Sequence, residues 1–282
     1  CIIGGHTLNG TADNNTVTMS GGEVNSIQGG RGTIGSCGNK VIIQDGAVVE
    51  DLVQAGRSSA GIISDNSIEM SSGNVRWLQA ARCKSKVDNN IKILNNKIVM
   101  TGGWAYSAIA ADGDHGTATN NIVSISDADG TINYIVGAKI RNGEGNAVEN
   151  SVIVNDSHAS RVVGAEVNLG DANKNSVNIS ASSLGYIMTD NVYGGISQYG
   201  NSVGNNVKTI NVISKNITGG KTQNYGDAYN NSVIVENSNV SELFDEEVRN
   251  DGCVYEGRLV RTKNQMRYTD KLKRAGFSYE KI

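Results

Sequence analysis

The chain has 282 residues, with 35 glycines, 5% aromatic residues and no proline, where average composition would give about fourteen prolines. The absence of proline favours long β-ladders, because proline has no amide hydrogen to donate, and it disfavours a disordered linker. The formal net charge of −3 gives no general attraction to nucleic acid or to an anionic membrane. Since no stretch approaches the ~18 apolar residues of a transmembrane helix, we expect this segment neither to bind nucleic acid nor to insert into a membrane.

A motif of the form Asn-x-Val/Ile recurs nine times along the chain. Its apolar members are Val17, Val41, Ile68, Ile98, Val123, Val152, Val177, Val207 and Val233. The eight intervals average 27 residues, and eight of the nine copies carry Met, Ile or Val again two positions later. Each copy therefore predicts a short strand with one buried face. The asparagine two positions before each apolar residue is predicted to turn the chain and to hydrogen-bond along a stack of repeats.

A second motif lies between these copies and consists of an apolar residue, a variable residue and two small residues. It begins at Ile2, Ile27, Val53, Leu78, Ala108, Ile135, Val162, Val192 and Ile217. Because the last two positions are always Gly or Ala, the backbone is predicted to pack closely against another part of the chain in every repeat.

Repeats of this length, each leaving an apolar face for its neighbour to cover, predict an all-β fold. We expect a right-handed parallel β-solenoid of about nine coils over residues 1–240. Since Ile2 already belongs to the second half of a repeat, the solenoid is expected to continue into further coils.

The residue just before the second motif varies in character, which is typical of an outward-facing column. Two members of that column are aromatic, Trp77 and Tyr134. Their rings are candidates for stacking against a sugar or a protein partner. The alternative interpretation is that they pack beneath a loop.

Two connections, over residues 78–98 and 177–192, are five residues longer than usual, and such insertions often map to a binding face. The first contains Arg82, Lys84, Lys86 and Lys92. These basic residues predict contact with an acidic glycan or protein, and a solvated charge cluster is the alternative.

Catalytic and cofactor motifs are not found in the sequence. The four cysteines have no C-x-x-C spacing and the three histidines lie in different repeats, so neither a metal site nor a cofactor is predicted. The stretch "DGDHG" at residues 112–116 gathers two carboxylates and a histidine in a turn, where polar turn chemistry suffices. Pectate-lyase-type enzymes share the solenoid and use stacked columns of Asp, Arg and Lys. The aligned columns are predicted to lack such a stack, so no enzymatic activity is expected.

Composition changes after residue 240. Of the 42 residues from 241 to 282, 17 are charged, against 36 of the 240 before them, which predicts a separate capping segment. Within it, "TKNQMRYTDKLKRAG" predicts a helix with Thr262 as its N-cap, Gln265 completing a capping box and Gly276 as its end.

The repeat resembles the passenger regions of autotransporter-like bacterial surface adhesins, which run Asn-Asn-x-Val-x-Ile, a Gly-rich turn and a Val-Tyr-Gly-Gly-like strand. The closest copy spans residues 175–195, with "NSVNIS" and "VYGG", and the resemblance covers residues 1–240. The tail from residue 257 looks like the closing segment of Gram-positive surface proteins. This resemblance implies an extracellular segment of a bacterial cell-surface adhesin or its rigid stalk, with a surface glycan or protein as partner. The alternatives are a polysaccharide-active lyase or hydrolase and a phage tail-spike module.

Overall fold

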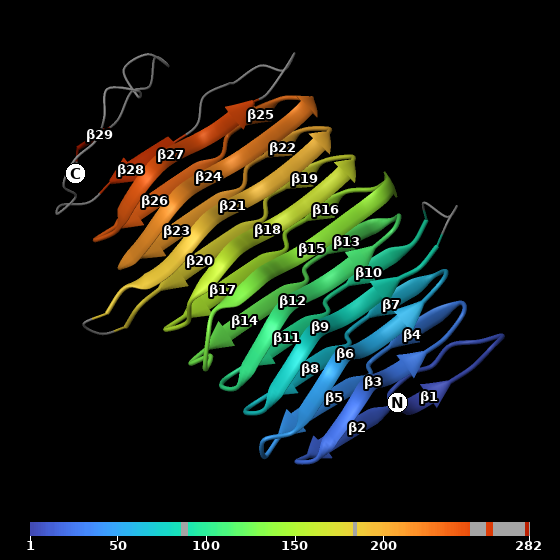
Figure 1. The fold of residues 1–282 in the computed structure, drawn as a ribbon. Coiled ribbons are helices and arrows are strands. Elements are labelled where there is room, and N and C mark those ends of the chain that lie inside the picture. Colours follow the sequence, from blue (N-terminus) through green and yellow to red (C-terminus); the bar gives the residue numbers. More distant parts are fainter. Residues whose placement is uncertain (86–89, 183–184, 249–257, 262–279, 282) are drawn as a thin grey trace.

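The computed structural model describes residues 1–85, 90–182, 185–248, 258–261 and 280–281. These residues form a parallel β-solenoid of about nine coils, in which nearly every coil contributes one strand to each of three sheets (Figure 1). The predicted all-β parallel solenoid of about nine coils is thereby confirmed, and the described residues include no helix.

Sheet A is formed by the long strands that carry the small-residue motif. They are β1 (Ile2–His6), β3 (Glu23–Arg31), β6 (Val48–Ser58), β9 (Asn74–Cys83), β12 (Trp104–Gly113), β15 (Ile132–Glu144), β18 (Ala159–Leu169), β21 (Ile187–Tyr199), β24 (Val212–Tyr225) and β27 (Asn239–Val248).

Sheet B is formed by short strands that follow those of sheet A. They are β4 (Gly35–Cys37), β7 (Ile62–Ser64), β10 (Lys92–Leu94), β13 (Thr117–Thr119), β16 (Ala147–Val148), β19 (Ala172–Asn173), β22 (Ser202–Val203) and β25 (Ala228–Tyr229).

Sheet C is formed by the strands that carry the Asn-x-Val/Ile motif, with two more strands from the C-terminal segment. They are β2 (Thr16–Ser20), β5 (Lys40–Gln44), β8 (Ser67–Met70), β11 (Lys97–Met100), β14 (Ile122–Ser126), β17 (Ser151–Asn155), β20 (Ser176–Ser180), β23 (Asn206–Ile210), β26 (Ser232–Glu236), β28 (Arg258–Arg261) and β29 (Glu280–Lys281).

The interior holds two apolar compartments. The larger one lies between sheet C and the first half of the sheet A strands, where Ile27 and Val41 are fully buried. The smaller one lies between sheet B and the second half of those strands, and it contains Ile93 and Ala111. Each coil leaves both compartments open along the rod axis, so the neighbouring coil completes its core.

A ladder of asparagines runs along the rod at the corner between sheets B and C. Its members are Asn15, Asn39, Asn66, Asn96, Asn121, Asn150, Asn175, Asn205 and Asn231. In each step the side-chain Nδ2 donates to the Oδ1 of the next asparagine at 2.8–3.0 Å. The backbone N–H of the same residue donates to that Oδ1 at 2.9–3.1 Å. The predicted hydrogen bonding along the stack is confirmed.

The residue before each ladder asparagine, and not the asparagine itself, makes the turn. That residue has a positive φ in all nine copies, for example 58° at Asn14, 56° at Asp65 and 53° at Lys174. The left-handed conformation there lets the chain turn the corner from sheet B to sheet C, and Asn, Asp or Gly supplies it in most copies.

The small-residue motif packs against this ladder. A Cβ added to Gly56 would lie 2.4 Å from the Asn66 Cγ, and one added to Gly29 would lie 2.5 Å from the Ala55 carbonyl oxygen of the next coil. One small position therefore meets the asparagine side chain and the other meets a neighbouring backbone. This contact is the close packing that the sequence predicted.

The C-terminal segment continues the β structure where it is described. Strand β27 spans the predicted boundary at residue 240, and strands β28 and β29 extend sheet C. The predicted helix over residues 262–276 lies outside the described residues, so the α-containing cap has no support in the described part of the segment. Within the described ranges, no helix is long and apolar enough to cross a membrane.

Candidate functional site

Sheet A carries a column of mainly charged side chains, called the charged column below, immediately after the two small residues of its motif. In register from coil to coil, the column reads Arg31, Arg57, Arg82, Asp112, Lys139, Glu166, Ile196, Lys221 and Glu247. The expectation that no column of Asp, Arg and Lys is stacked in this chain was wrong. The signal was present in the sequence, one position beyond the small pair.

The strands of sheet A bend where the two small residues lie, because both of these positions face the interior. A Cβ on Gly29 would lie 3.3 Å from the Asn39 Cβ, and one on Gly30 would lie 2.5 Å from its Oδ1. The residues on either side of the small pair therefore both face outward. The side chains of these two columns crowd one another on the outer face. Gln54, which precedes a small pair, is therefore only 1% exposed although it faces outward.

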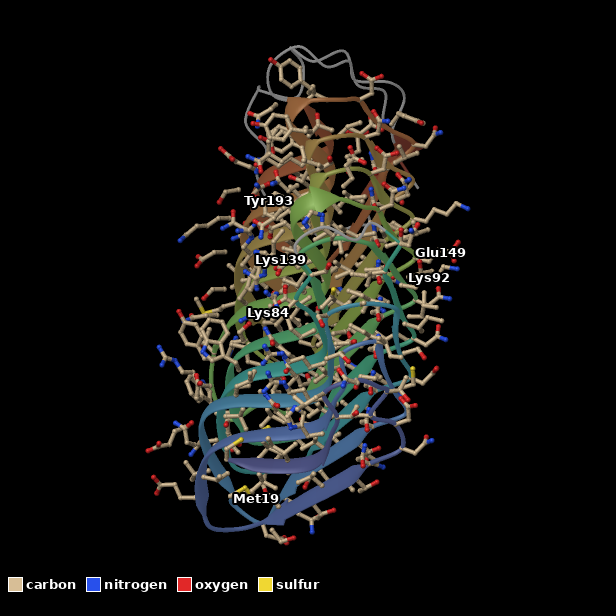
Figure 2. All side chains as sticks on the ribbon, turned by 90° about the vertical axis from the view of Figure 1, so that its right-hand side faces the viewer. Met19, Lys84, Lys92, Lys139, Glu149 and Tyr193 are labelled. Atoms are coloured by element: carbon tan, nitrogen blue, oxygen red, sulfur yellow. The ribbon has the colours of Figure 1, made fainter. Side chains whose placement is uncertain are left out.

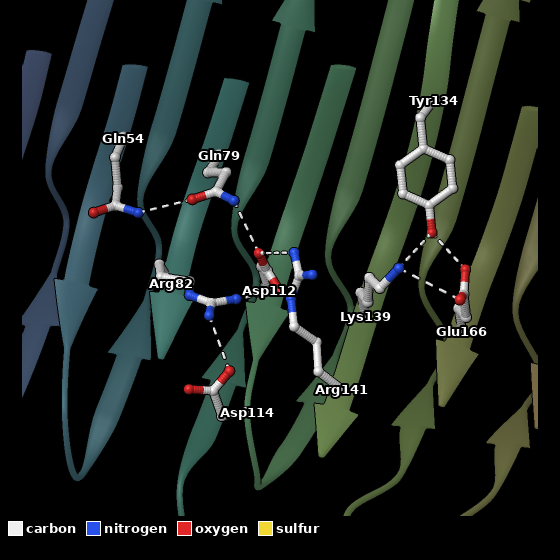
Figure 3. A network of polar contacts seen from close by, with 9 residues as sticks. All are labelled: Gln54, Gln79, Arg82, Asp112, Asp114, Tyr134, Lys139, Arg141 and Glu166. Atoms are coloured by element: carbon white, nitrogen blue, oxygen red, sulfur yellow. Dashed lines mark hydrogen bonds and ion pairs between the residues drawn. The ribbon is translucent and has the colours of Figure 1, made fainter. Parts of the chain in front are cut away.

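Asp112 is the centre of a polar network on this face (Figure 3). Arg141 holds its carboxylate with two bonds, Nε to Oδ1 at 2.6 Å and Nη2 to Oδ2 at 2.7 Å. Arg82 reaches the same carboxylate at 2.5 Å and also contacts Asp114 at 2.9 Å. Gln79 donates to Asp112 at 2.8 Å. The Asp112 side chain is fully buried. These four polar contacts offset the free-energy cost of burying its negative charge.

A second network begins on the next strand of sheet A, at Tyr134. Its hydroxyl donates to Glu166, and Lys139 Nζ donates to the same hydroxyl at 3.0 Å. Burial and the neighbouring Glu166 raise the pKa of the Tyr134 phenol. Burial alone would raise the pKa of Glu166, but Lys139 and Arg161 lower it below its ordinary value. The network therefore holds an ionised carboxylate against a neutral phenol.

The predicted site residues fall into different surroundings. Trp77 is half-buried and makes an edge-on contact with Tyr106, at 5.4 Å between ring centroids. The ring of Tyr134 is approached by Lys139 and Arg161, at 5.0 and 5.4 Å from its centroid. These cations leave less of the Tyr134 ring available for stacking.

The basic residues of the long connection are also separated. Arg82 lies in strand β9 and is engaged by Asp112 and Asp114, whereas Lys84 is exposed on the same side of the rod as Lys139 (Figure 2). Lys92 belongs to sheet B and points to another side. Lys86 lies outside the described residues.

Two cavities of about 210 Å³ each open on the outer face of sheet A. The first, which we call the basic pocket, is defined by His6, Arg31, Arg57 and Lys84. The second, which we call the amide pocket, is defined by Lys139, Arg141, Glu166, Asn142, Asn168, Gln198 and Gln223. Neither pocket was predicted, because each is assembled from residues of several coils.

Two exposed aromatic rings lie just after residues of the amide pocket in the sequence. Tyr199 and Tyr225 are paired in register between β21 and β24 and stack at 6.1 Å between centroids. They are 45% and 59% exposed and lie next to Gln198 and close to Gln223 in the chain. This pair was not predicted from the sequence, because both tyrosines lie at the ends of their strands, beyond the recurring motif.

Groups of three or more His, Cys, Asp or Glu side chains that could hold a metal ion are absent from the described ranges. No protein family, curated protein or solved structure matches the chain at a significant level.

Proposed function

We propose that this chain is a rigid segment of a bacterial cell-surface protein, an adhesin or its stalk, which presents the outer face of sheet A to a glycan or protein partner. The observation that carries the proposal is the in-register outer face of sheet A, where charged, amide and aromatic side chains line up across successive coils.

The spacing of this face suits an extended polymer. Neighbouring strands lie about 4.8 Å apart, so a ligand that runs along the rod meets an equivalent position in every coil. Each contact is weak by itself, but contacts on one rigid support add because later contacts form at high effective concentration. The amide pocket supplies hydrogen-bond donors and acceptors, and Tyr199 and Tyr225 supply exposed rings that can stack on a sugar.

The interior supports a role in display. The asparagine ladder satisfies backbone and side-chain groups in every coil, and the two core compartments run the length of the rod. A rod held together in this way resists local opening, which protects an extracellular segment from proteolysis.

The direct experiment measures binding of the purified chain to a broad glycan array and to host-cell surfaces. Its variants are Y199A/Y225A on sheet A and K40Q/E69Q, which removes an exposed ion pair on sheet C without changing the net charge. We expect the sheet A variant to lose binding and the sheet C variant to retain it. The reverse pattern would contradict the proposed binding face. Antibody labelling of intact cells tests the surface location.

An enzyme that acts on polysaccharides is a second candidate, favoured by the carboxylates Asp112, Asp114 and Glu166 on the same face. Against it, Asp112 is bound by Arg82 and Arg141, Asp114 by Arg82, and Glu166 by Lys139 and Arg161, so each of these carboxylates already has a cationic partner. Release of reducing ends or unsaturated sugars from acidic polysaccharides would establish the enzyme. A trimeric mass in analytical ultracentrifugation would favour the tail-spike alternative.

A further inference from the structure

The basic pocket differs from the rest of the outer face of sheet A in its charge balance. Further along the face the cations of the charged column have carboxylate partners. These pairs are Arg82 with Asp112 and Asp114, Lys139 with Glu166, and Lys221 with Glu247. Within the described ranges, the lining of the basic pocket contains no Asp or Glu, and neither Arg31 nor Arg57 forms an ion pair.

The two arginines lie directly beside each other in the register of β3 and β6. Arg57 is half-buried, and its pKa is lowered by burial and by the neighbouring Arg31 and Arg82 guanidinium groups. Placing like charges together in a partly buried site opposes folding. Such an arrangement is typical of a site that binds a ligand of opposite charge.

The chemistry of the lining defines the ligand class. A guanidinium group binds sulfate or carboxylate oxygens with two parallel hydrogen bonds, and the two arginines stand on neighbouring strands, whose backbones lie about 4.8 Å apart. Thr33, Ser58 and Ser59 line the same cavity, so their hydroxyls lie near any bound sugar. The described lining contains no Phe, Tyr or Trp, and the His6 imidazole is its one aromatic ring, which is a small platform for nucleobase stacking. An acidic glycan therefore fits better than a single-stranded nucleic acid.

We infer that the basic pocket binds the anionic groups of an acidic glycan, with Arg31 and Arg57 each engaging a sulfate or carboxylate group and Lys84 completing the positive field. This inference rests on the proposed binding face and names its ligand class. The remainder of the polymer runs along sheet A toward the amide pocket.

The test measures the affinity of the purified chain for four glycans by isothermal titration calorimetry. Heparin carries sulfate and carboxylate groups, dextran sulfate carries only sulfate, polygalacturonate carries only carboxylate, and dextran is neutral. The test variant is R31Q/R57Q. The matched control is K174Q/K215Q, which removes the same charge at two lysines that are 70% and 76% exposed and lie outside the pocket. Circular dichroism verifies that both variants fold.

We expect R31Q/R57Q to weaken binding of at least one acidic glycan by about tenfold or more, because each arginine loses a charge-assisted pair of hydrogen bonds. K174Q/K215Q and neutral dextran set the baseline for non-specific charge effects. In R31K/R57K, which keeps the charge but loses the planar fork, affinity should be intermediate. The sulfate-only and carboxylate-only arms identify which anion the pocket prefers.

Equal weakening in R31Q/R57Q and K174Q/K215Q would overturn the inference, and so would tighter binding to an oligodeoxythymidylate than to any acidic glycan. If the chain binds host cells through sheet A but binds no acidic glycan, the inference fails and the proposed function stands. If it binds acidic glycans at this pocket but is absent from the cell surface, the proposed function fails instead.

Discussion

Arg57 lies directly beside Arg31 in the register of sheet A, and neither guanidinium forms an ion pair within the described part of the chain. One coil further, Arg82 continues the same column but is held by Asp112 and Asp114. Within one coil, the charged column thus changes from arginines without a carboxylate partner to an arginine with two. The first region is available to an anion, whereas in the second region opposite charges stabilise one another.

Removal of one uncompensated arginine should not destabilise the protein. We expect Arg57→Gln to leave the midpoint of urea unfolding unchanged or to raise it in the absence of anions, because the repulsion from Arg31 and Arg82 disappears. Heparin should raise the thermal unfolding temperature of the unchanged protein more than that of the variant. A loss of more than about 1 kcal/mol in the free energy of unfolding would show that Arg57 is a structural residue.

The opposite result is expected at Asp112. Asp112→Asn removes the carboxylate that Arg82 and Arg141 share and should lower the free energy of unfolding by about 2–4 kcal/mol, since partly buried cations lose their partner. Urea unfolding measures this change. The double variant R82Q/D112N should recover part of the loss, and an additive effect of the two substitutions would argue against the coupling.

The asparagine ladder should be the largest single polar contribution to the rod. Asn121→Ala removes the acceptor of the Asn96 backbone and side-chain donors, and it leaves the Ile93 carbonyl without its side-chain donor. We expect a loss of about 3 kcal/mol in the free energy of unfolding, because buried polar groups lose their partners. The exposed Asn133→Ala serves as control, and a similar loss in both variants would contradict the role of the ladder.

Much of this interior could be predicted from the sequence, because it depends on local periodicity. The ladder asparagines and the Gly or Ala pairs recur at fixed distances from the apolar residues of the strands, so their columns can be aligned without a structure. The charged column, one residue beyond the small pair, is equally visible when the repeats are aligned. It was not predicted because the prediction rested on the positions before the small pair.

The side-chain contacts on the outer face of sheet A could not be predicted from the repeat pattern. The two small positions both face inward, which breaks the period-two alternation and brings the columns on either side of them to the same face. Tyr134 occupies an outward column as predicted, but Lys139 on its own strand and Arg161 on the next strand lie over its ring. Such contacts depend on side-chain rotamers and on the bend of the strand, neither of which the repeat pattern specifies.

The last described coil should respond to pH through Glu246. This side chain accepts a hydrogen bond from the Asn231 backbone at 3.2 Å, in the place where the next ladder asparagine would stand. Burial, with a contribution from Asp245, raises the pKa of Glu246 to about 7. Because the folded chain keeps a proton that the unfolded chain releases near its ordinary pKa, stability should fall as the pH rises from about 4.5 to about 7.

Hydrogen exchange of the β26 and β27 amides between pH 4 and pH 8, corrected for intrinsic exchange rates, measures this effect. Glu246→Gln should remove the fall and increase protection above pH 7, since the amide oxygen still accepts the Asn231 hydrogen bond. An unchanged pH profile in the variant would assign the dependence to another group.

The stacked tyrosines should matter for binding and little for folding. Y199A/Y225A should reduce affinity for the glycans that the chain binds, while the free energy of unfolding changes by less than about 0.5 kcal/mol because about half of each side chain is exposed. Tyr186→Ala, which removes a tyrosine that is 54% exposed elsewhere on the surface, is the control. Equal affinity in the three proteins would remove this pair from the binding face.

The most direct measurement is hydroxyl-radical footprinting of the chain with and without a heparin oligosaccharide, read by mass spectrometry. The prediction is protection of His6 and Tyr106, which lie on sheet A strands, together with unchanged labelling of Ile42 and Val99 on sheet C. Protection of the sheet C residues, or no protection at saturating oligosaccharide, would contradict sheet A as the face that binds an acidic glycan.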